Sequence, residues 1–389
     1  MNPTVKTILG LFLFLMLTGG CKQAYVSPHK SPPTGYLVVE GYITGNGPTQ
    51  FVLSRTIALP GDSAIPVETN AQVQVEGNDN SSYPLADQGG GHYSVAGMPL
   101  NATVKYRLRI QTANGETYLS DFVQYKPTPA IDSINWIQNG NGVQIYANTH
   151  DATNNTRYYQ WQYEETWEYH SGEVSYYKFL DNTNPVSVVL RNMPADQIYR
   201  CWHNEISTNL LLGSSAKLAQ DVIFRHPLNL IPSNSQQLGV LYSMLVRQYA
   251  LTEDGYNYLT LMQKNTESLG SIFDVQPSVL KGNIHSLTNP DEQVIGYISA
   301  GTVQQQRIFI YGYQVSPWYY SFTCPIRDTM VPLDEASLQF FFSTLSYIPV
   351  DMHYNMFTGR QDSWLANQSY CIDCRYQGGT LTMPTFWPN

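Results

Sequence analysis

The feature that most constrains the fold is a run of alternating aromatic and polar residues at 157–169. Its odd-numbered positions are almost all aromatic, and its even-numbered positions are mostly polar. Side chains of a β-strand point alternately to the two faces of a sheet, so this pattern predicts one long strand with a buried aromatic face. The aromatic face comprises Tyr159, Trp161, Tyr163, Trp167 and Tyr169.

Glu165 interrupts the aromatic face of this strand. Burying an ionised carboxylate is costly unless a cation or several hydrogen-bond donors compensate its charge. We therefore expect one of two arrangements. Either a cationic neighbour pairs with Glu165, with Arg200 or Arg225 as the candidates, or the carboxylate lies at the strand end and reaches water.

Residues 36–126 carry the pattern of several short strands. The run from Leu37 to Ile43 is typical of a strand, and Asn114-Gly115 separates two alternating runs. Asn-Gly between such runs is a strong hairpin signal, and six or seven short strands at this spacing predict an immunoglobulin-like β-sandwich. The Pro-rich stretch 126–129 predicts a joint. The expected fold is therefore mainly β, with this sandwich followed by a larger β-rich domain over 127–389.

Helix is expected at only two places, both inside the second domain. At 252–267, Thr252 can cap the first turn and Glu253 suits the positive end of the helix dipole. A second helix is expected from about Leu333 to Thr344, with its apolar residues buried.

The N-terminal sequence predicts export and lipid anchoring. Residues 1–20 combine Lys6 with a ten-residue apolar stretch, which is shorter than the about 20 residues needed to span a bilayer. Small residues precede Cys21 as in a bacterial lipobox, so we expect lipidation of Cys21 with acyl chains such as palmitate. The alternative is an ordinary cleaved signal with a chance cysteine. Residues 21–35 are Pro-rich and predict an extended tether.

Four further cysteines are expected to form two disulfides, because an exported chain meets an oxidising environment. Three pairings are open. We favour Cys201–Cys324 together with Cys371–Cys374, the second pair being a Cys-x-x-Cys motif. Zinc or redox roles for this motif are less favoured, since zinc needs four nitrogen or sulfur ligands.

Composition and motifs exclude several classes of function. The chain has 21 Lys and Arg against 30 Asp and Glu and no basic run, which argues against nucleic-acid binding. It contains no HExxH, GxSxG or phosphate-loop motif. We therefore expect no catalytic residue, no metal and no cofactor. If the chain were a hydrolase instead, its carboxylates would be sought around Glu165, Glu205 or Asp351.

Aromatic residues outside the long strand are the candidates for ligand contact. Exposed aromatic rings can stack on a sugar or a peptide. The candidates are Tyr158, Trp318, Tyr319 and Trp364. The alternative is that these rings belong to the hydrophobic core.

Three stretches resemble a known family. They are 249–258 (YALTEDGYNY), 270–284 (beginning GSIFDVQP) and 371–387 (from CIDCR to PTFW). Together they resemble the domain-of-unknown-function 4249 family, which comprises outer-membrane lipoproteins of Bacteroidota-type bacteria. The family has no established reaction, and its members are often encoded beside TonB-dependent outer-membrane transporters. The resemblance therefore implies an accessory or substrate-capturing role.

These observations converge on a lipoprotein anchored in the outer membrane, on either its periplasmic or its surface face. Its expected role is non-enzymatic binding of a peptide or glycan ligand, in partnership with a TonB-dependent transporter. One alternative is a structural or adhesion lipoprotein that uses its β-domain as a spacer. A less favoured alternative is an extracellular hydrolase.

Overall fold

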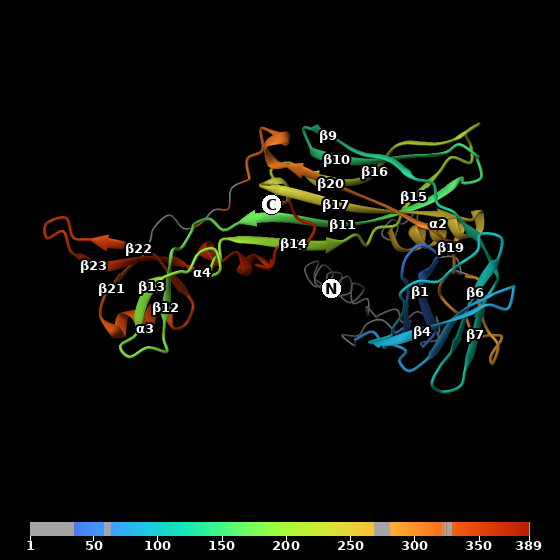
Figure 1. Ribbon diagram of the computed structural model, residues 1–389, viewed down its shortest axis with the longest axis horizontal. Coiled ribbons are helices and arrows are strands. Elements are labelled where there is room, and N and C mark those ends of the chain that lie inside the picture. The colour runs from blue at the N-terminus through green and yellow to red at the C-terminus, as the bar shows by residue number, and fades with distance from the viewer. Residues whose placement is uncertain are drawn as a thin grey trace, which may run out of the picture.

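The computed structural model describes residues 35–57, 64–267, 281–320, 322, 324 and 329–388. The expected signal peptide, Cys21 and most of the tether lie outside the described residues. The described chain forms an elongated body, with a barrel-like sheet at one end, two packed sheets in the middle and a small lobe at the other end (Figure 1). The expected mainly β fold is thereby confirmed.

The sheet at one end of the molecule, here called the barrel, contains ten strands. Eight of them close into a barrel-like ring, because β8 pairs with both β6 and β19. The strands are β1 (Leu37–Thr44), β2 (Thr49–Arg55), β3 (Gln72–Gly77), β4 (Ser82–Gly89), β5 (His92–Val95), β6 (Lys105–Gln111), β7 (Thr117–Ser120), β8 (Val123–Lys126), β18 (Ile284–Ser286) and β19 (Ala300–Gly301). The immunoglobulin-like sandwich expected for 36–126 is not confirmed, and the ring includes strand β19 from far along the chain.

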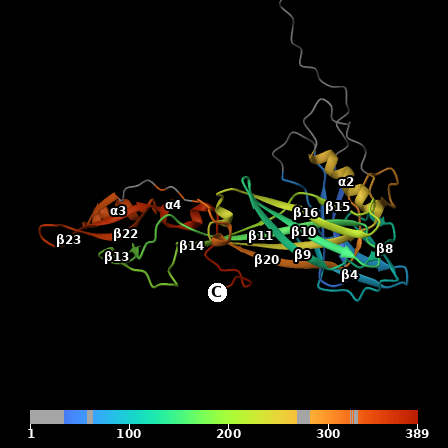
Figure 2. The same ribbon diagram turned by 90° about the horizontal axis from the view of Figure 1, so that it is seen from above.

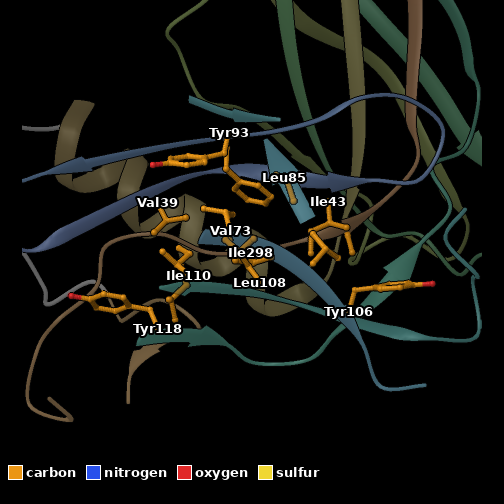
Figure 3. Packing of buried hydrophobic residues seen from close by; sticks show 14 of the residues in the cluster. Val39, Ile43, Val73, Leu85, Tyr93, Tyr106, Leu108, Ile110, Tyr118 and Ile298 are labelled. Carbon is orange, nitrogen blue, oxygen red and sulfur yellow. The ribbon is translucent and has the colours of Figure 1, made fainter. Parts of the chain in front are cut away.

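Alternating burial along the strands fills the barrel interior. Strand β6 buries every second residue, namely Tyr106, Leu108 and Ile110. Figure 3 shows Leu108 and Ile110 close to Val73 of β3 and to Ile298 from the segment that leads into β19. Burial of apolar side chains, at roughly 25 cal/mol per Å², is what holds such a ring closed.

The middle of the molecule consists of two sheets that share one aromatic core. One sheet has the order β16-β10-β9, and the other has β14-β11-β17-β20 with β15 beside β11. Their bounds are β9 (Ile131–Asn139), β10 (Gly142–Asp151), β11 (Tyr158–His170), β14 (Arg200–Ile206), β15 (Leu211–Ser214), β16 (Asp221–Pro232), β17 (Leu241–Leu251) and β20 (Val303–Tyr311). We call them the central sheets.

The long strand predicted at 157–169 is confirmed as β11. All five aromatic residues of its odd-numbered face are buried in the core that the central sheets share. Val143 and Ile145 of β10 reach the same core from the facing sheet. The aromatic run therefore specifies both the strand and the surface on which the second sheet packs.

Both expected helices are present. Helix α2 (Glu253–Glu267) begins where the Thr252 hydroxyl accepts a hydrogen bond from the Gly255 backbone N–H at 3.2 Å. Helix α3 (Glu335–Phe342) begins after Asp334, whose side chain accepts from the Ser337 N–H at 2.9 Å. Figure 2 shows α2 beside β15, near the barrel end of the molecule. No helix within the described ranges is long and apolar enough to cross a membrane.

The lobe at the end opposite the barrel, here called the distal lobe, combines two distant parts of the sequence (Figure 1). A hairpin of β12 (Tyr177–Leu180) and β13 (Ser187–Leu190) packs beside α3 and a sheet of β21 (Thr329–Pro332), β22 (Tyr347–Tyr354) and β23 (Gln361–Gln368). The short helices α4 (Ser369–Ile372) and η3 (Cys374–Gln377) follow β23. Two further short helices are η1 (Gln236–Leu238) and η2 (Gly312–Val315).

Candidate functional site

The four aromatic ligand candidates lie in three separate places. Tyr158, on β11, packs against Tyr256 of α2 with ring centroids 5.0 Å apart. The Trp318 ring is half-buried against the aromatic core, and its Nε1 donates to the Ser235 carbonyl at 2.9 Å. The neighbouring Tyr319 is exposed.

Trp364 is buried in the distal lobe. It lies on β23, with only 6% of its surface exposed, and meets Tyr177 edge to face at 4.9 Å. Trp364 is thus a core residue of the lobe, as the alternative interpretation held. The structure does not bring the four candidates into one binding surface.

The four cysteines form two disulfides, but the favoured pairing was wrong. Cys201 pairs with Cys374, and Cys324 pairs with Cys371, with Cα atoms 5.7 Å and 5.6 Å apart. The Cys-x-x-Cys motif lies where α4 ends and η3 begins, so its two cysteine side chains contact different neighbours. Cys374 joins the aromatic core beside Cys201, whereas Cys371 joins a separate apolar cluster beside Cys324.

Both expectations for Glu165 were wrong. Its carboxylate is 7% exposed and accepts hydrogen bonds from Tyr242 Oη at 2.7 Å and Asn229 Nδ2 at 3.0 Å. Burial raises the pKa of Glu165, the nearby charge of Glu205 adds to the rise, and the two hydrogen bonds oppose it. Arg200 instead pairs with Glu168, because β14 places it opposite the other face of β11.

The three carboxylates considered for a hydrolase do not form one cluster. Glu165 and Glu205 face each other across β11 and β14, whereas Asp351 lies on β22 in the distal lobe. Among the described residues, no group of three or more His, Cys, Asp or Glu side chains could hold a metal ion.

A large cleft lies between the barrel, helix α2 and the central sheet of β11 and β17. It is a cleft of about 1070 Å³, which is large enough for a drug-sized or oligomeric ligand. Strand β1 contributes Tyr42 to the lining and β17 contributes Tyr249, and the two rings meet where these strands approach each other. The end of the polar face of β11 contributes Gln160 and Gln162 to the same cleft.

Four tyrosines line the cleft in two pairs. The Tyr42 and Tyr249 rings meet edge to face at 5.0 Å, and the Tyr258 and Tyr297 rings lie 5.4 Å apart. Tyr249 Oη donates to Gln162 Oε1 at 3.0 Å, and Tyr42 Oη donates to the Ala250 carbonyl at 3.3 Å. Because these contacts fix the rings, they form a preorganised aromatic surface.

Tyr258 differs from the other three tyrosines because its hydroxyl is unsatisfied. The residue is 6% exposed, and its Oη has no hydrogen-bond partner within the described part of the chain. Burial raises the pKa of Tyr258, and a backbone contact from Gly296, whose geometry is not that of a hydrogen bond, partly offsets the rise. A buried polar atom without a partner costs free energy.

The polar lining of the cleft is almost entirely neutral. Six residues with carboxamide side chains line it, namely Asn46, Gln50, Gln160, Gln162, Asn209 and Gln305. The Asn46 amide already bonds to the Val303 backbone through both its nitrogen and its oxygen. The charged lining residues are Glu40 and Arg247, and Arg247 Nη2 already pairs with Glu164 Oε2 at 3.0 Å. A carboxamide offers both donors and an acceptor, so this lining suits a neutral ligand with many hydroxyl or amide groups.

Sequence reasoning missed most of this cleft. Gln160 and Gln162 belong to the polar face of the predicted strand, and Tyr249 and Tyr258 lie within a stretch that carries the family resemblance. Those signals were present, but they did not show that β1 approaches β17. That relationship depends on the parallel pairing of β1 with β19, which are more than 250 positions apart.

Comparison with known proteins identifies a family. The model of the family described as Domain of unknown function (DUF4249) matches residues 24–307. A search of curated proteins finds no match to the chain. The matched region includes the barrel strands, β11, β17 and helix α2, and so nearly all of the cleft lining. The chain therefore belongs to the Domain of unknown function (DUF4249) family.

Proposed function

We propose that this chain is a non-enzymatic ligand-binding lipoprotein of the outer membrane. In this proposal, acylated Cys21 anchors the protein, and the cleft between the barrel and the central sheet holds a neutral glycan or peptide. The bound ligand would then pass to a TonB-dependent transporter in the same membrane.

The observation that carries the binding proposal is the chemistry of the cleft. Tyrosine rings stack on the apolar faces of sugars and on peptide groups, and carboxamides hydrogen-bond to hydroxyls or backbone amides. The fixed pair of Tyr42 and Tyr249 supplies the stacking surface. A cleft with few charges favours a neutral ligand, because an ionic ligand would lose its hydration without a counter-charge.

An exposed apolar hairpin supports the proposal of a protein partner. The turn between β22 and β23 carries Met356 and Phe357, which are 92% and 95% exposed. Figure 1 shows this turn at the far tip of the distal lobe, at the other end of the molecule from the barrel. Exposed aromatic and methionine side chains are enriched at protein interfaces. We assign this tip to the contact with the transporter.

Glycan and capped-peptide arrays test the binding proposal, followed by calorimetry with the strongest ligand. Tyr249→Ala removes half of the stacking pair and should weaken binding about tenfold, which is roughly 1.4 kcal/mol. Tyr319→Ala is the matched control, because it removes an exposed tyrosine outside the cleft. Absence of any neutral glycan or peptide ligand would refute the proposal and favour a spacer role. Equal effects of the two substitutions would place the ligand elsewhere.

Mild detergent extraction followed by co-purification tests the partner proposal. The wild-type chain should be recovered together with a β-barrel transporter, and Phe357→Ser should reduce the recovered transporter. Recovery of the wild-type chain only as a lone monomer would contradict the partnership. Mass spectrometry of the same preparation should find the thiol of Cys21 acylated, and an unmodified thiol would remove the anchor from the proposal.

A further inference from the structure

A second cavity lies where the distal lobe joins the central sheets. Its volume is about 630 Å³, and it is lined by residues of β12, the end of α3, β22, α4 and η3. Three basic side chains reach it, namely Lys178, Arg191 and Arg375. The site is separate from the tyrosine-lined cleft and shares no residue with it.

Two of the three cations already have a carboxylate partner. Lys178 forms an ion pair with Asp196. Arg375 binds Asp373 through two parallel contacts, from Nε to Oδ1 at 2.9 Å and from Nη2 to Oδ2 at 2.5 Å. Asp196 and Asp373 are the two carboxylates whose charges raise the pKa of Arg191, and these ion pairs neutralise both of them.

Arg191 has no ion-pair partner among the residues that the structure describes. Its Nη1 donates to the Asp196 backbone carbonyl at 3.2 Å, and its Nε donates to Ser175 Oγ at 3.4 Å. Its Nη2 forms no hydrogen bond within the described ranges. Burial lowers the pKa of Arg191, as expected for a desolvated guanidinium without a counter-ion. The remaining acidic lining residue, Asp181, is exposed.

The rest of the cavity wall is mainly apolar. Phe179 and Phe342 come from the core of the distal lobe, and Ile198 and Ile348 belong to the apolar cluster around Cys371. A ligand that fills this space therefore needs an apolar body as well as an anionic group. One unpaired guanidinium matches one negative charge, and a dianion such as phosphate would keep a charge without a partner.

We propose that this cavity binds a small organic monocarboxylate with an apolar body. The carboxylate would accept hydrogen bonds from Arg191 Nη2, and the apolar body would contact Phe179 and Ile348. A guanidinium presents donors in a planar fork that matches a carboxylate, so Arg191 is the residue that selects the ligand class.

Calorimetry with three probes tests this site on the full chain. We expect 3-phenylpropanoate to bind, and the neutral 3-phenylpropanamide to bind at least about tenfold more weakly, because a charge-assisted hydrogen bond contributes more than a neutral one. Inorganic phosphate should bind weakly or not at all. Arg191→Met should abolish the preference for the carboxylate, and Arg191→Lys should restore part of it.

Arg360→Gln is the matched control, since it removes an exposed cation from the same lobe outside the cavity. It should leave carboxylate binding unchanged. Equal binding of the carboxylate and the amide, or unchanged carboxylate binding by Arg191→Met, would overturn the proposal. So would the absence of carboxylate binding to the wild-type chain, or a preference for phosphate.

A measurement on the wild-type chain covers the case in which Arg191→Met does not fold. Phenylglyoxal modifies accessible arginines, and peptide mass spectrometry locates the modified residues. 3-Phenylpropanoate should protect Arg191 and leave Arg360 reactive, whereas the amide should protect neither. Equal modification of Arg191 with and without the carboxylate would contradict the assignment.

Discussion

Glu168 and Trp387 are 219 residues apart in sequence, yet Trp387 Nε1 donates a hydrogen bond to Glu168 Oε2 at 3.0 Å. Both residues are buried. Arg200 completes the contact with two charge-assisted hydrogen bonds to the same carboxylate, at 2.7 Å and 2.6 Å. Strand β11 is therefore joined both to its neighbour β14 and to the segment around Trp387.

Trp387→Phe should destabilise the chain because it removes one of the two donors to Glu168 Oε2 and leaves only Arg200 Nη2 on that buried oxygen. We expect a loss of about 1.5–3 kcal/mol in the free energy of unfolding, measured by urea titration at pH 7. Trp136→Phe is the control, since the Trp136 indole has no hydrogen bond among the described residues and its loss should cost less. Equal losses for the two variants would show that the Glu168 contact contributes nothing.

Glu168 should also give the chain a defined sensitivity to acid. Burial by itself raises the pKa of Glu168, but hydrogen bonds from His170, Arg200 and Trp387 outweigh it and hold the pKa at about 2. A group with a lowered folded-state pKa stabilises the protein above its ordinary pKa of 4.5, and that stability is lost as the pH falls towards 2. Glu168→Gln should remove this part of the acid dependence. A wild-type stability that stays constant over this window would contradict the prediction.

Glu165 lies on the same strand as Glu168, but its titration should change the stability of the chain with pH in the opposite direction. Burial and the charge of Glu205 raise its pKa above the ordinary value of 4.5, so its contribution to stability is complete below that value and is lost as the pH rises. Glu165→Gln keeps an acceptor for Tyr242 and removes the titration. The variant should therefore gain stability relative to the wild type as the pH rises above about 4.5. A constant difference between the two proteins would show that Glu165 ionises normally.

The local pattern of the sequence predicted strands and helices well. The two-residue period at 157–169 specified β11 and its buried face, and Thr252 marked the start of α2. These features depend on neighbouring residues only, so one sequence contains the information. The partner of Glu165 was missed because Tyr242 and Asn229 come from different strands.

Long-range pairing was the part that the sequence could not provide. Closure of the barrel requires β19 to enter between β1 and β8, and the cleft exists because of that closure. The disulfide pairing could not be predicted for the same reason, since the direction of each cysteine side chain depends on how α4 and η3 pack. Spacing alone favoured a bond within the Cys-x-x-Cys motif, whereas packing separates its two sulfur atoms.

Peptide mapping under non-reducing conditions should recover the linkages Cys201–Cys374 and Cys324–Cys371. In the chain-entropy description, cross-links over 173 and 47 residues stabilise by roughly 5 and roughly 4 kcal/mol. The double variant Cys201→Ser/Cys374→Ser should therefore lose at least as much stability as Cys324→Ser/Cys371→Ser. Recovery of a peptide with a bond between Cys371 and Cys374 would contradict the structure.

Substitutions at Trp364 and Tyr319 distinguish a role in the core from a role in ligand binding. Trp364→Ala should destabilise the distal lobe by about 3–5 kcal/mol, because it removes a buried ring that packs against Tyr177. Tyr319→Ala should change stability by less than about 0.5 kcal/mol, since that side chain is 76% exposed. Thermal unfolding with a probe in the lobe measures both effects. If Trp364→Ala left the unfolding transition unchanged while abolishing ligand binding, Trp364 would be a binding residue and its place in the core would be wrong.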